Sequence, residues 1–489
     1  MCGIVGIYSQ EPVAQALYDS LIHLQHRGQH AAGILTATER FHSKHGLGLV
    51  REIFTRNDLV SLVGKFGIAH TRYPTAGGYG ESDIQPMWVG NPRGIALAHN
   101  GNLVNYHTLA KAIRAADRHL NSGLDSEVLL LTFADYLAEN QSANSDEQFF
   151  NALCEALQKL FQTIQGAYSV VSLVMGKGLI AFRDPHGIRP LVLGKKIRDN
   201  GACDYLFASE TTPFYALGFE LMGDLQPGEV AFVNLQGELK RRVIKTETFR
   251  PCVFEYVYFA RPDSTLDGVN VYRARQRMGE NLAKAWQKKF PTHIPDVVIP
   301  APFTANTAAL SFALTLGVRY SEGLYKNPFI GRTFIMPNQS MRSQQVRYKL
   351  TPQRIEIENK SVLILDDSIV RGTTSKEIVK MIREFGAKKI YFAACAPPIK
   401  SPCFYGIDLP SERDLIAAQM SEKAIADFLG VDLLLYQSES DLIEAVTRRG
   451  NHEIGKPCMG CMTGEYVCGN LTPERRQLLK NARNLEHDV

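Results

Sequence analysis

The stretch VLILDDSIVRGTTS at residues 362–375 decides how the second half of the chain folds. Four successive apolar residues, 362–365, predict a buried strand. The following TTSKEIVKMIREFG has helical spacing and ends in Gly386, and KKIYFAAC after it predicts another strand. Strand, helix and strand at this spacing predict a parallel α/β unit.

Two carboxylates follow the first of these strands directly. Asp366 and Asp367 stand at its carboxyl end, where α/β sheets bind ligands. The run from Ser368 to Thr374 leads into the helix, whose first N–H groups can cradle a phosphate. Paired carboxylates suit ribose hydroxyls and Mg²⁺. The alternative is an ordinary strand–turn–helix connection in which Asp and Ser cap the helix.

The whole run resembles the loop that binds phosphoribosyl diphosphate (PRPP) in type I phosphoribosyltransferases. The resemblance implies that Asp366 and Asp367 bind the ribose and Mg²⁺. This chain differs from the family pattern at one position, because close relatives carry a Mg²⁺-binding Ser where this chain has Ala305. The neighbouring Thr304 is the expected substitute. The implied PRPP-binding residues are Asp366, Asp367, Ser368, Val370, Arg371, Gly372, Thr373 and Thr374.

The alternation of strands and helices begins near Asp296, with PDVVIP and the helical ANTAALSFALTLG. Between these and residue 362 lies a polar, basic stretch with little periodicity. Long stretches of this kind in a compact domain are usually functional loops. We therefore expect residues 326–350 to form a lid that excludes water from the site.

The first half of the chain has a different pattern of predicted strands and helices. Short β-rich runs broken by Gly, Asn and Asp predict hairpins from Gly166 onward, and helices are expected at 13–25 and 126–137. The expected class is α+β. The charged segment KRRVIKTETFRP marks a boundary, so the expected domains are residues 2–240, residues 250–445 and a tail at 446–489.

Cys2 is a candidate nucleophile. Removal of Met1 would free its α-amine, whose pKa of roughly 7.7–8.0 in model compounds suits a general base beside the thiol. The alternative is a small apolar residue that merely packs. The motifs LQHRGQHAAG, AHTRYPTAG and AHNGNL follow at residues 24–33, 69–77 and 98–103. Together with MCGIVGI they resemble the glutaminase domain of the N-terminal-nucleophile (Ntn) amidotransferases, which has four αββα layers.

This resemblance assigns roles in the hydrolysis of the glutamine γ-amide. Cys2 would form a thioester, and Asn100 and Gly101 would stabilise the oxyanion. Arg72 would bind the α-carboxylate, and Asp125 the α-ammonium. The alternative for Arg72 is a surface ion pair. Asp125 is also placed to be a helix N-cap before SEVLL, a role that is compatible with binding the α-ammonium.

Two further expectations concern neighbouring side chains. Tyr73 would couple PRPP occupancy to glutamine binding, unless it only packs the turn. His26, His70 and His99 suggest a metal, but the resemblance implies none there, and we expect structural histidines.

A glutaminase half joined to a PRPP-binding half is similar to the amidophosphoribosyltransferase family. The implied reaction converts glutamine, PRPP and water into 5-phosphoribosylamine, glutamate and diphosphate, the first step of purine synthesis. Ammonia would pass between the sites through a closed channel. The alternatives are another Ntn amidotransferase, against which the DDSIVRGTTS run argues, and a PRPP-sensing regulator, for which no DNA-binding module is found.

Four further cysteines match metal-binding positions of this family's iron–sulfur branch. Cys458 and Cys461 form a CxxC, which alone indicates redox chemistry, metal binding or chance. Cys252 and Cys403 each follow a proline. The resemblance implies a structural [4Fe–4S] cluster, while zinc and unliganded thiols remain alternatives.

Composition agrees with a cytoplasmic enzyme. The 489 residues are 45% hydrophobic and 21% charged, and 54 basic against 50 acidic residues give a formal charge of +4. We therefore expect neither a nucleic-acid partner nor a membrane partner. Nine cysteines without a secretory signal indicate a reducing compartment. The family resemblance adds feedback by purine nucleotides and a homotetramer.

Overall fold

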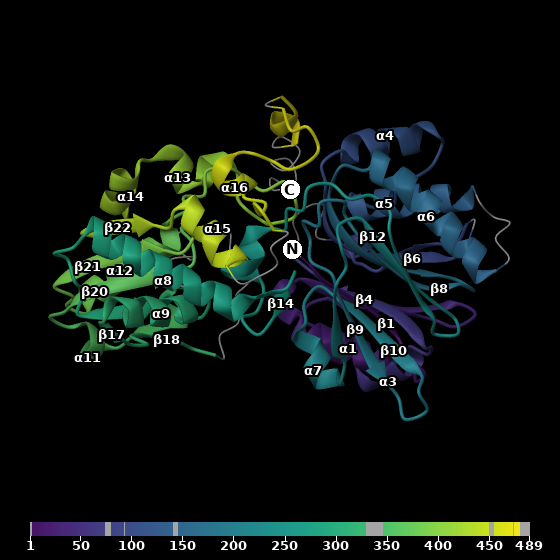
Figure 1. Ribbon diagram of the computed structural model, residues 1–489, viewed down its shortest axis with the longest axis horizontal. Coiled ribbons are helices and arrows are strands. Elements are labelled where there is room, and N and C mark those ends of the chain that lie inside the picture. Colours follow the sequence, from purple (N-terminus) through teal and green to yellow (C-terminus); the bar gives the residue numbers. More distant parts are fainter. Residues whose placement is uncertain are drawn as a thin grey trace.

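The chain forms two lobes, with stacked antiparallel sheets in one and a parallel sheet in the other (Figure 1). The N-terminus lies where the lobes meet. The computed structural model describes residues 2–73, 80–91, 93–139, 145–328, 346–448, 454–472 and 474–479.

The first sheet has seven strands in the order β11-β9-β10-β1-β4-β2-β3, all paired antiparallel. Gly3 of β1 pairs with Thr71 of β4, which places the N-terminus beside Arg72. The strands are β1 (Gly3–Tyr8), β2 (Ala31–Ala37), β3 (Phe41–Leu47), β4 (Phe66–Arg72), β9 (Val192–Ile197), β10 (Cys203–Ala208) and β11 (Glu220–Asp224).

The second sheet has six strands in the order β13-β12-β8-β7-β6-β5. Its edge strand β13 contains the KRRV of the predicted boundary segment, so regular structure continues to Val243. Charged side chains are well suited to such an exposed edge. The strands are β5 (Met87–Val89), β6 (Ile95–Leu103), β7 (Gly166–Val174), β8 (Gly178–Arg183), β12 (Glu229–Asn234) and β13 (Leu239–Val243).

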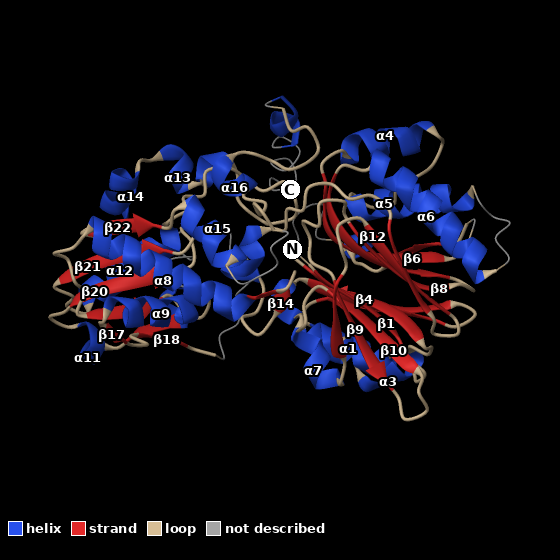
Figure 2. Cartoon of the chain, in the orientation of Figure 1, coloured by secondary structure: helices blue, strands red, loops and turns tan. Residues whose placement is uncertain are grey.

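Helices cover the outer faces of these sheets, which confirms the αββα layering (Figure 2). Alternate strand residues such as Ile4, Ile68 and Val171 fill the space between the sheets. The first sheet carries α1 (Ala14–His23), α2 (Val50–Ile53), α3 (Arg56–Ser61) and α7 (Thr212–Leu217). The second carries α4 (Tyr106–Ala115), α5 (Asp125–Ala138) and α6 (Asp146–Thr163).

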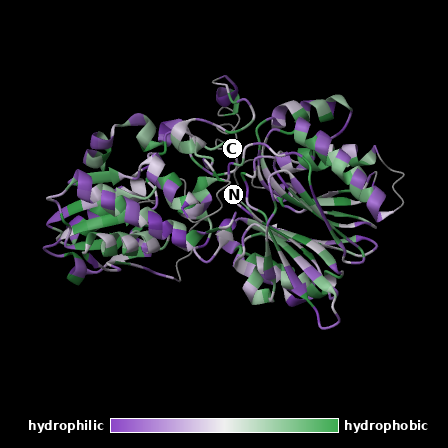
Figure 3. Ribbon diagram, in the orientation of Figure 1, coloured by the Kyte–Doolittle hydropathy of each residue, from purple (hydrophilic) through white to green (hydrophobic). Residues whose placement is uncertain are grey.

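The second lobe confirms the predicted α/β class. Its five strands run parallel in the order β17-β16-β20-β21-β22. Hydrophobic residues dominate these strands (Figure 3), because helices bury both faces. The strands are β16 (Val297–Pro300), β17 (Arg319–Tyr320), β20 (Ser361–Asp366), β21 (Lys389–Ala394) and β22 (Leu433–Tyr436).

Side chains of β20 alternate between two cores. Leu363 and Leu365 pack with α8, α9 and α15, whereas Val362 and Ile364 pack with α12 and α14. The long helix α8 packs closely on α9 and was not identified from the sequence. The helices are α8 (Val271–Lys289), α9 (Asn306–Leu316), α12 (Thr373–Glu384), α13 (Ile416–Gln419), α14 (Glu422–Leu429) and α15 (Glu439–Thr447).

Short elements join and flank the lobes. The connection holds the π-helical turn η3 (Glu255–Phe259) and the hairpin of β14 (Thr265–Leu266) and β15 (Val269–Asn270). A second hairpin, β18 (Leu324–Lys326) with β19 (Leu350–Pro352), precedes α11 (Arg354–Ile357), and α16 (Gly460–Thr463) lies in the tail. The predicted lid falls mostly on residues 329–345, outside the described residues. Among the described helices, none has both the length and the apolar character needed to span a membrane.

Candidate active site

The fold brings Cys2 and Asn100 together from the two stacked sheets. The backbone N–H of Cys2 donates to Asn100 Oδ1 at 3.2 Å. The Cys2 thiol lies 3.7 Å from the carbonyl oxygen of Tyr73, just beyond β4. Residues 98 positions apart thus form one site around the predicted nucleophile.

Asn100 and Gly101 follow each other in β6, where Asn100 contacts the Cys2 backbone. Asn100 is fully buried, and its Nδ2 has no hydrogen-bond partner within the described part of the chain. A buried, unused donor beside a nucleophile suits a developing oxyanion. Gly101 has φ +155°, and a Cβ there would lie 1.9 Å from the Ala167 carbonyl oxygen. Only glycine fits this position.

Arg72 and Asp125 are both buried near the same site. Arg72 ends β4 with only 2% of its surface exposed, and its Nη2 lies 3.8 Å from Asp83 Oδ2. A surface ion pair is therefore the wrong interpretation, and Asp83 is a partner that the sequence did not indicate.

Asp125 does not cap α5, contrary to the alternative considered above. It is the first helical residue, and the N-cap position belongs to Leu124. Its Oδ2 accepts from the N–H of Leu103 at 2.9 Å, and its Oδ1 lies 3.8 Å from His99 Nδ1. The carboxylate thus holds the end of strand β6, which also carries Asn100.

The nearby histidines are held neutral. Burial, followed by the positive charge of Arg72, lowers the pKa of His70 to about 3. Burial also lowers the pKa of His99, although Asp125 opposes this shift. His26 instead contacts Glu210 at 2.7 Å. Among the described residues, no three His, Cys, Asp or Glu side chains are placed to hold one metal ion.

The second predicted site lies at the carboxyl end of β20. The N–H of Asp367 donates to Asp366 Oδ1 at 2.8 Å, and Ser368 Oγ donates to Asp367 Oδ1 at 2.6 Å. The hydroxyl of Thr304 donates to Asp367 Oδ2, so it reaches the diacid as expected of a substitute for a Ser at position 305. Ala305 itself is buried at the start of α9.

The diacid has the electrostatics of a cation site. Burial and the neighbouring Asp367 raise the pKa of Asp366 well above its usual range, and burial also raises the pKa of Asp367. Two adjacent carboxylates repel each other unless a proton or a cation lies between them. Hard oxygen ligands of this kind fit Mg²⁺.

The turn after the diacid presents the N-terminus of α12. Gly372 adopts φ +74° at the N-cap, while Thr373 and Thr374 are exposed in the first helical turn. Arg371 is also exposed, with Nη2 3.8 Å from Asp414. Open N–H groups and hydroxyls here suit a phosphate. The carbonyl of Val370 accepts from the Ile416 N–H at 3.0 Å, which anchors the turn.

The four predicted ligand cysteines, Cys252, Cys403, Cys458 and Cys461, are buried together. Cys252 pairs with Cys458 in a parallel bridge. After burial, the nearby Cys252 and Cys403 are among the causes that raise the pKa values of the Cys458 and Cys461 thiols. Cys468 donates its thiol to the Gly166 carbonyl at 3.2 Å, and its N–H donates to the hydroxyl of Tyr405, whose own N–H donates to Cys403 Sγ.

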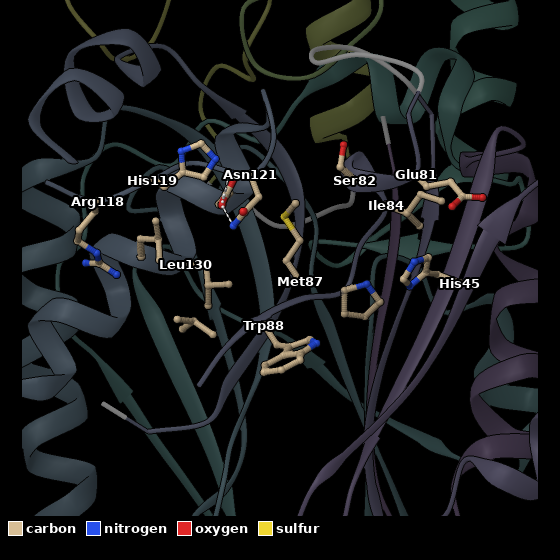
Figure 4. A pocket seen from close by; sticks show the side chains of 14 residues that line it. His45, Glu81, Ser82, Ile84, Met87, Trp88, Arg118, His119, Asn121 and Leu130 are labelled. Carbon is tan, nitrogen blue, oxygen red and sulfur yellow. Dashed lines mark hydrogen bonds between the residues drawn. The ribbon is translucent and has the colours of Figure 1, made fainter. Parts of the chain in front are cut away.

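A cavity of about 610 Å³ lies in the first lobe (Figure 4). Trp88, His119 and Glu127 line it, together with Glu81 and Ser82 from the segment that carries Asp83. None of the predicted site residues is among its lining residues, so the chemistry is not assigned to this cavity.

Comparison with known proteins decides the family. Residues 78–216 match the model of a glutamine amidotransferase domain. The chain is 46% identical over 490 residues to the amidophosphoribosyltransferase of Pseudomonas aeruginosa, covering 99% of this chain and 96% of that protein. This chain belongs to the amidophosphoribosyltransferase family. The family's enzyme from Saccharomyces cerevisiae is 44% identical, with 100% and 98% covered.

Solved structures of the family have the same fold. The glutamine PRPP amidotransferase of B. subtilis, complexed with ADP and GMP, superposes with a TM-score of 0.83 at 36% identity, covering 96% of this chain and 98% of that one. The predicted family and fold are confirmed, and with them the assignment of a pentosyltransferase enzyme at the first step of purine biosynthesis. The iron–sulfur form stays a prediction.

Proposed function

We propose that this chain transfers the amide nitrogen of glutamine to PRPP, giving 5-phosphoribosylamine, glutamate and diphosphate. One observation carries the proposal: a thiol beside an unused amide donor in one lobe, and a half-buried Asp366 next to a buried Asp367 before a helix N-terminus in the other. Family membership supplies the two substrates.

At the first site, Cys2 attacks the γ-carbonyl carbon of glutamine. Its proton passes to its own α-amine, once Met1 is removed, and from there to the departing ammonia. Asn100 Nδ2 and the Gly101 N–H hold the oxyanion. Arg72 and Asp125 bind the two charged groups of the amino acid. Water then cleaves the thioester to release glutamate.

At the second site, Asp366 and Asp367 bind the ribose hydroxyls and Mg²⁺, with Thr304 orienting Asp367 through its hydroxyl. Magnesium, when bound, offsets the charge of the diphosphate leaving group. The residues from Ser368 to Thr374 hold the phosphate at the helix N-terminus. Their common role is to fix the anomeric carbon where ammonia can reach it.

Ammonia must travel between the sites without meeting bulk water, which would protonate it. The lobes touch close to the oxyanion donors: Asn102 Nδ2 donates to the Phe404 carbonyl at 2.9 Å, and Gly406 packs against Gly101. We propose that the passage begins at this contact and that residues 326–350 close it. Tyr73 would couple binding of PRPP at the second site to binding of glutamine at the first site.

We also propose a [4Fe–4S] cluster held by Cys252, Cys403, Cys458 and Cys461. The thiols are buried and mutually close, yet no three of the described thiols are placed for one ion. Soft thiolates of this kind suit an iron–sulfur cluster, with zinc as the alternative. The cluster would fasten the tail to the second lobe.

Further properties belong to the same proposal. The complex of the B. subtilis enzyme with ADP and GMP supports feedback by purine nucleotides. We also propose domains at 2–240 and 250–445 with a tail at 446–489, assembly into a homotetramer, and a cytoplasmic location.

The test is to measure glutamate and diphosphate release by anaerobically purified protein, with and without PRPP and Mg²⁺. Equal release of both products only with PRPP supports coupled transfer. Glutamate without diphosphate limits the function to a glutaminase. Absence of both products contradicts the proposal.

A further inference from the structure

Asp83 is a buried acidic residue that the proposed mechanism does not use. Only 4% of its surface is exposed, and its Oδ2 lies 3.8 Å from Arg72 Nη2. It ends the short 3-10 turn η2 (Glu81–Asp83). Its neighbours Ser82 and Ile84 line the cavity of Figure 4, whereas Asp83 is not among the lining residues. The carboxylate is therefore directed to the arginine and not to the cavity.

The segment that carries Asp83 is held in place on two sides. Gln85, two residues later, is also buried, and its Oε1 accepts from the His99 N–H at 2.7 Å, which fastens the segment to β6. On the other side, a Cβ at Gly33 of β2 would lie 2.2 Å from the Gln85 carbonyl oxygen, so the two backbones are in direct contact. The position of Asp83 is therefore fixed independently of its ion pair.

Burial makes this pair important for Arg72. A guanidinium with 2% of its surface exposed requires an opposite charge, because an unpaired buried charge is strongly destabilising. Asp83 supplies such a charge before glutamine binds. Its fixed place also sets the direction of the guanidinium, whose planar fork then offers a defined edge to a second carboxylate. An arginine that is held in advance loses less conformational freedom when the substrate binds.

We propose that Asp83 is a positioning residue that holds Arg72 in the orientation that binds the α-carboxylate of glutamine. The inference rests on the proposed function, in which Arg72 binds that group. Asp83 acts only through Arg72 and takes no part in the attack by Cys2. Its loss therefore weakens glutamine binding and leaves the chemical step unchanged.

The test measures kcat and KM for glutamate release by Asp83→Asn, which keeps the size of the side chain and removes its charge. We expect the KM for glutamine to rise about tenfold, as for the loss of one charged contact, with kcat within about twofold. The matched control is Asp204→Asn, which should leave the KM within about twofold. Asp204 is a buried aspartate of the same lobe, paired with Arg198 at 2.6 Å and bonded to Ser9, beyond the end of β1 opposite Cys2. A wild-type or lower KM in Asp83→Asn overturns the inference.

A second substrate separates positioning from a general structural role. 4-Aminobutanamide has the amide and the amine of glutamine but no α-carboxylate, so Arg72 has no group to bind in it. Its kcat/KM in Asp83→Asn should stay within about twofold of the wild-type value, while that of glutamine falls about tenfold. Equal losses for the two substrates would show a structural role and overturn the inference.

Asp83→Glu keeps the charge but moves the carboxylate by one methylene, so the KM for glutamine should rise only about threefold with kcat unchanged. If Asp83→Asn fails to fold, a wild-type KM in Asp83→Glu overturns the inference. Wild-type protein that releases glutamate, with an unchanged KM in folded Asp83→Asn, refutes the positioning role alone. Wild-type protein that releases no glutamate refutes the proposed function and the positioning role with it.

Discussion

Replacing Asn100 by alanine is the sharpest test of the first site. The side chain is fully buried, and its Nδ2 is a donor without a partner in the described residues. Loss of one such oxyanion donor costs about 2.7–4 kcal/mol in the transition state, or about 10²–10³ in kcat. The KM for glutamine should change little, because the oxyanion exists only after attack. The hydrogen bond from the Cys2 N–H to Asn100 Oδ1 is also lost, which costs about 1 kcal/mol of folding stability.

The assay compares glutamate release with ammonia-dependent diphosphate release by the same preparation. Ammonia-dependent synthesis should stay within about twofold, because it needs only the second lobe. Asn105→Ala is the control, since this buried asparagine bonds to Thr163 and Gln165 away from Cys2. The reasoning would be refuted by equal losses in both reactions, or by a loss confined to KM.

Three further predictions address the nucleophile, acid stability and the cysteines. Cys2→Ala should abolish glutamine-dependent synthesis and keep ammonia-dependent synthesis; loss of both would show that the sites do not work separately. His70 has a pKa of about 3 in the fold against 6.5 unfolded, so the unfolded chain binds more protons between these values and stability falls as pH drops. Between pH 6.5 and pH 4 the free energy of unfolding falls by about 3 kcal/mol for this reason. In urea titrations the His70→Gln variant should lose less stability over this pH range, and a loss equal to that of the wild type would contradict the prediction. Cys458→Ser should lower bound iron and Tm together, and an iron-free wild type with the same Tm would count against a cluster.

Local signals made much of the fold predictable. The four apolar residues before Asp366 predicted β20, because a strand that is buried on both faces of a parallel sheet has a continuous run of apolar residues. The helical spacing after Thr373 predicted α12. Helix α8, which packs closely on α9, was not predicted from the sequence. The interpretation of Asp125 as a cap was wrong, because a carboxylate before an apolar helix looks the same in sequence whether it caps that helix or holds a neighbouring strand.

The sequence by itself determined which chemical groups are present and their order along the chain: a thiol at position 2, the NGN run at 100–102, the diacid and the paired cysteines. Only the tertiary structure decided which distant groups meet. Arg27, Glu255 and Arg275 form one buried connection between the lobes, although 228 residues separate the first two. No local pattern encodes such contacts, because burial makes a charged side chain depend on a partner that only the folded chain supplies.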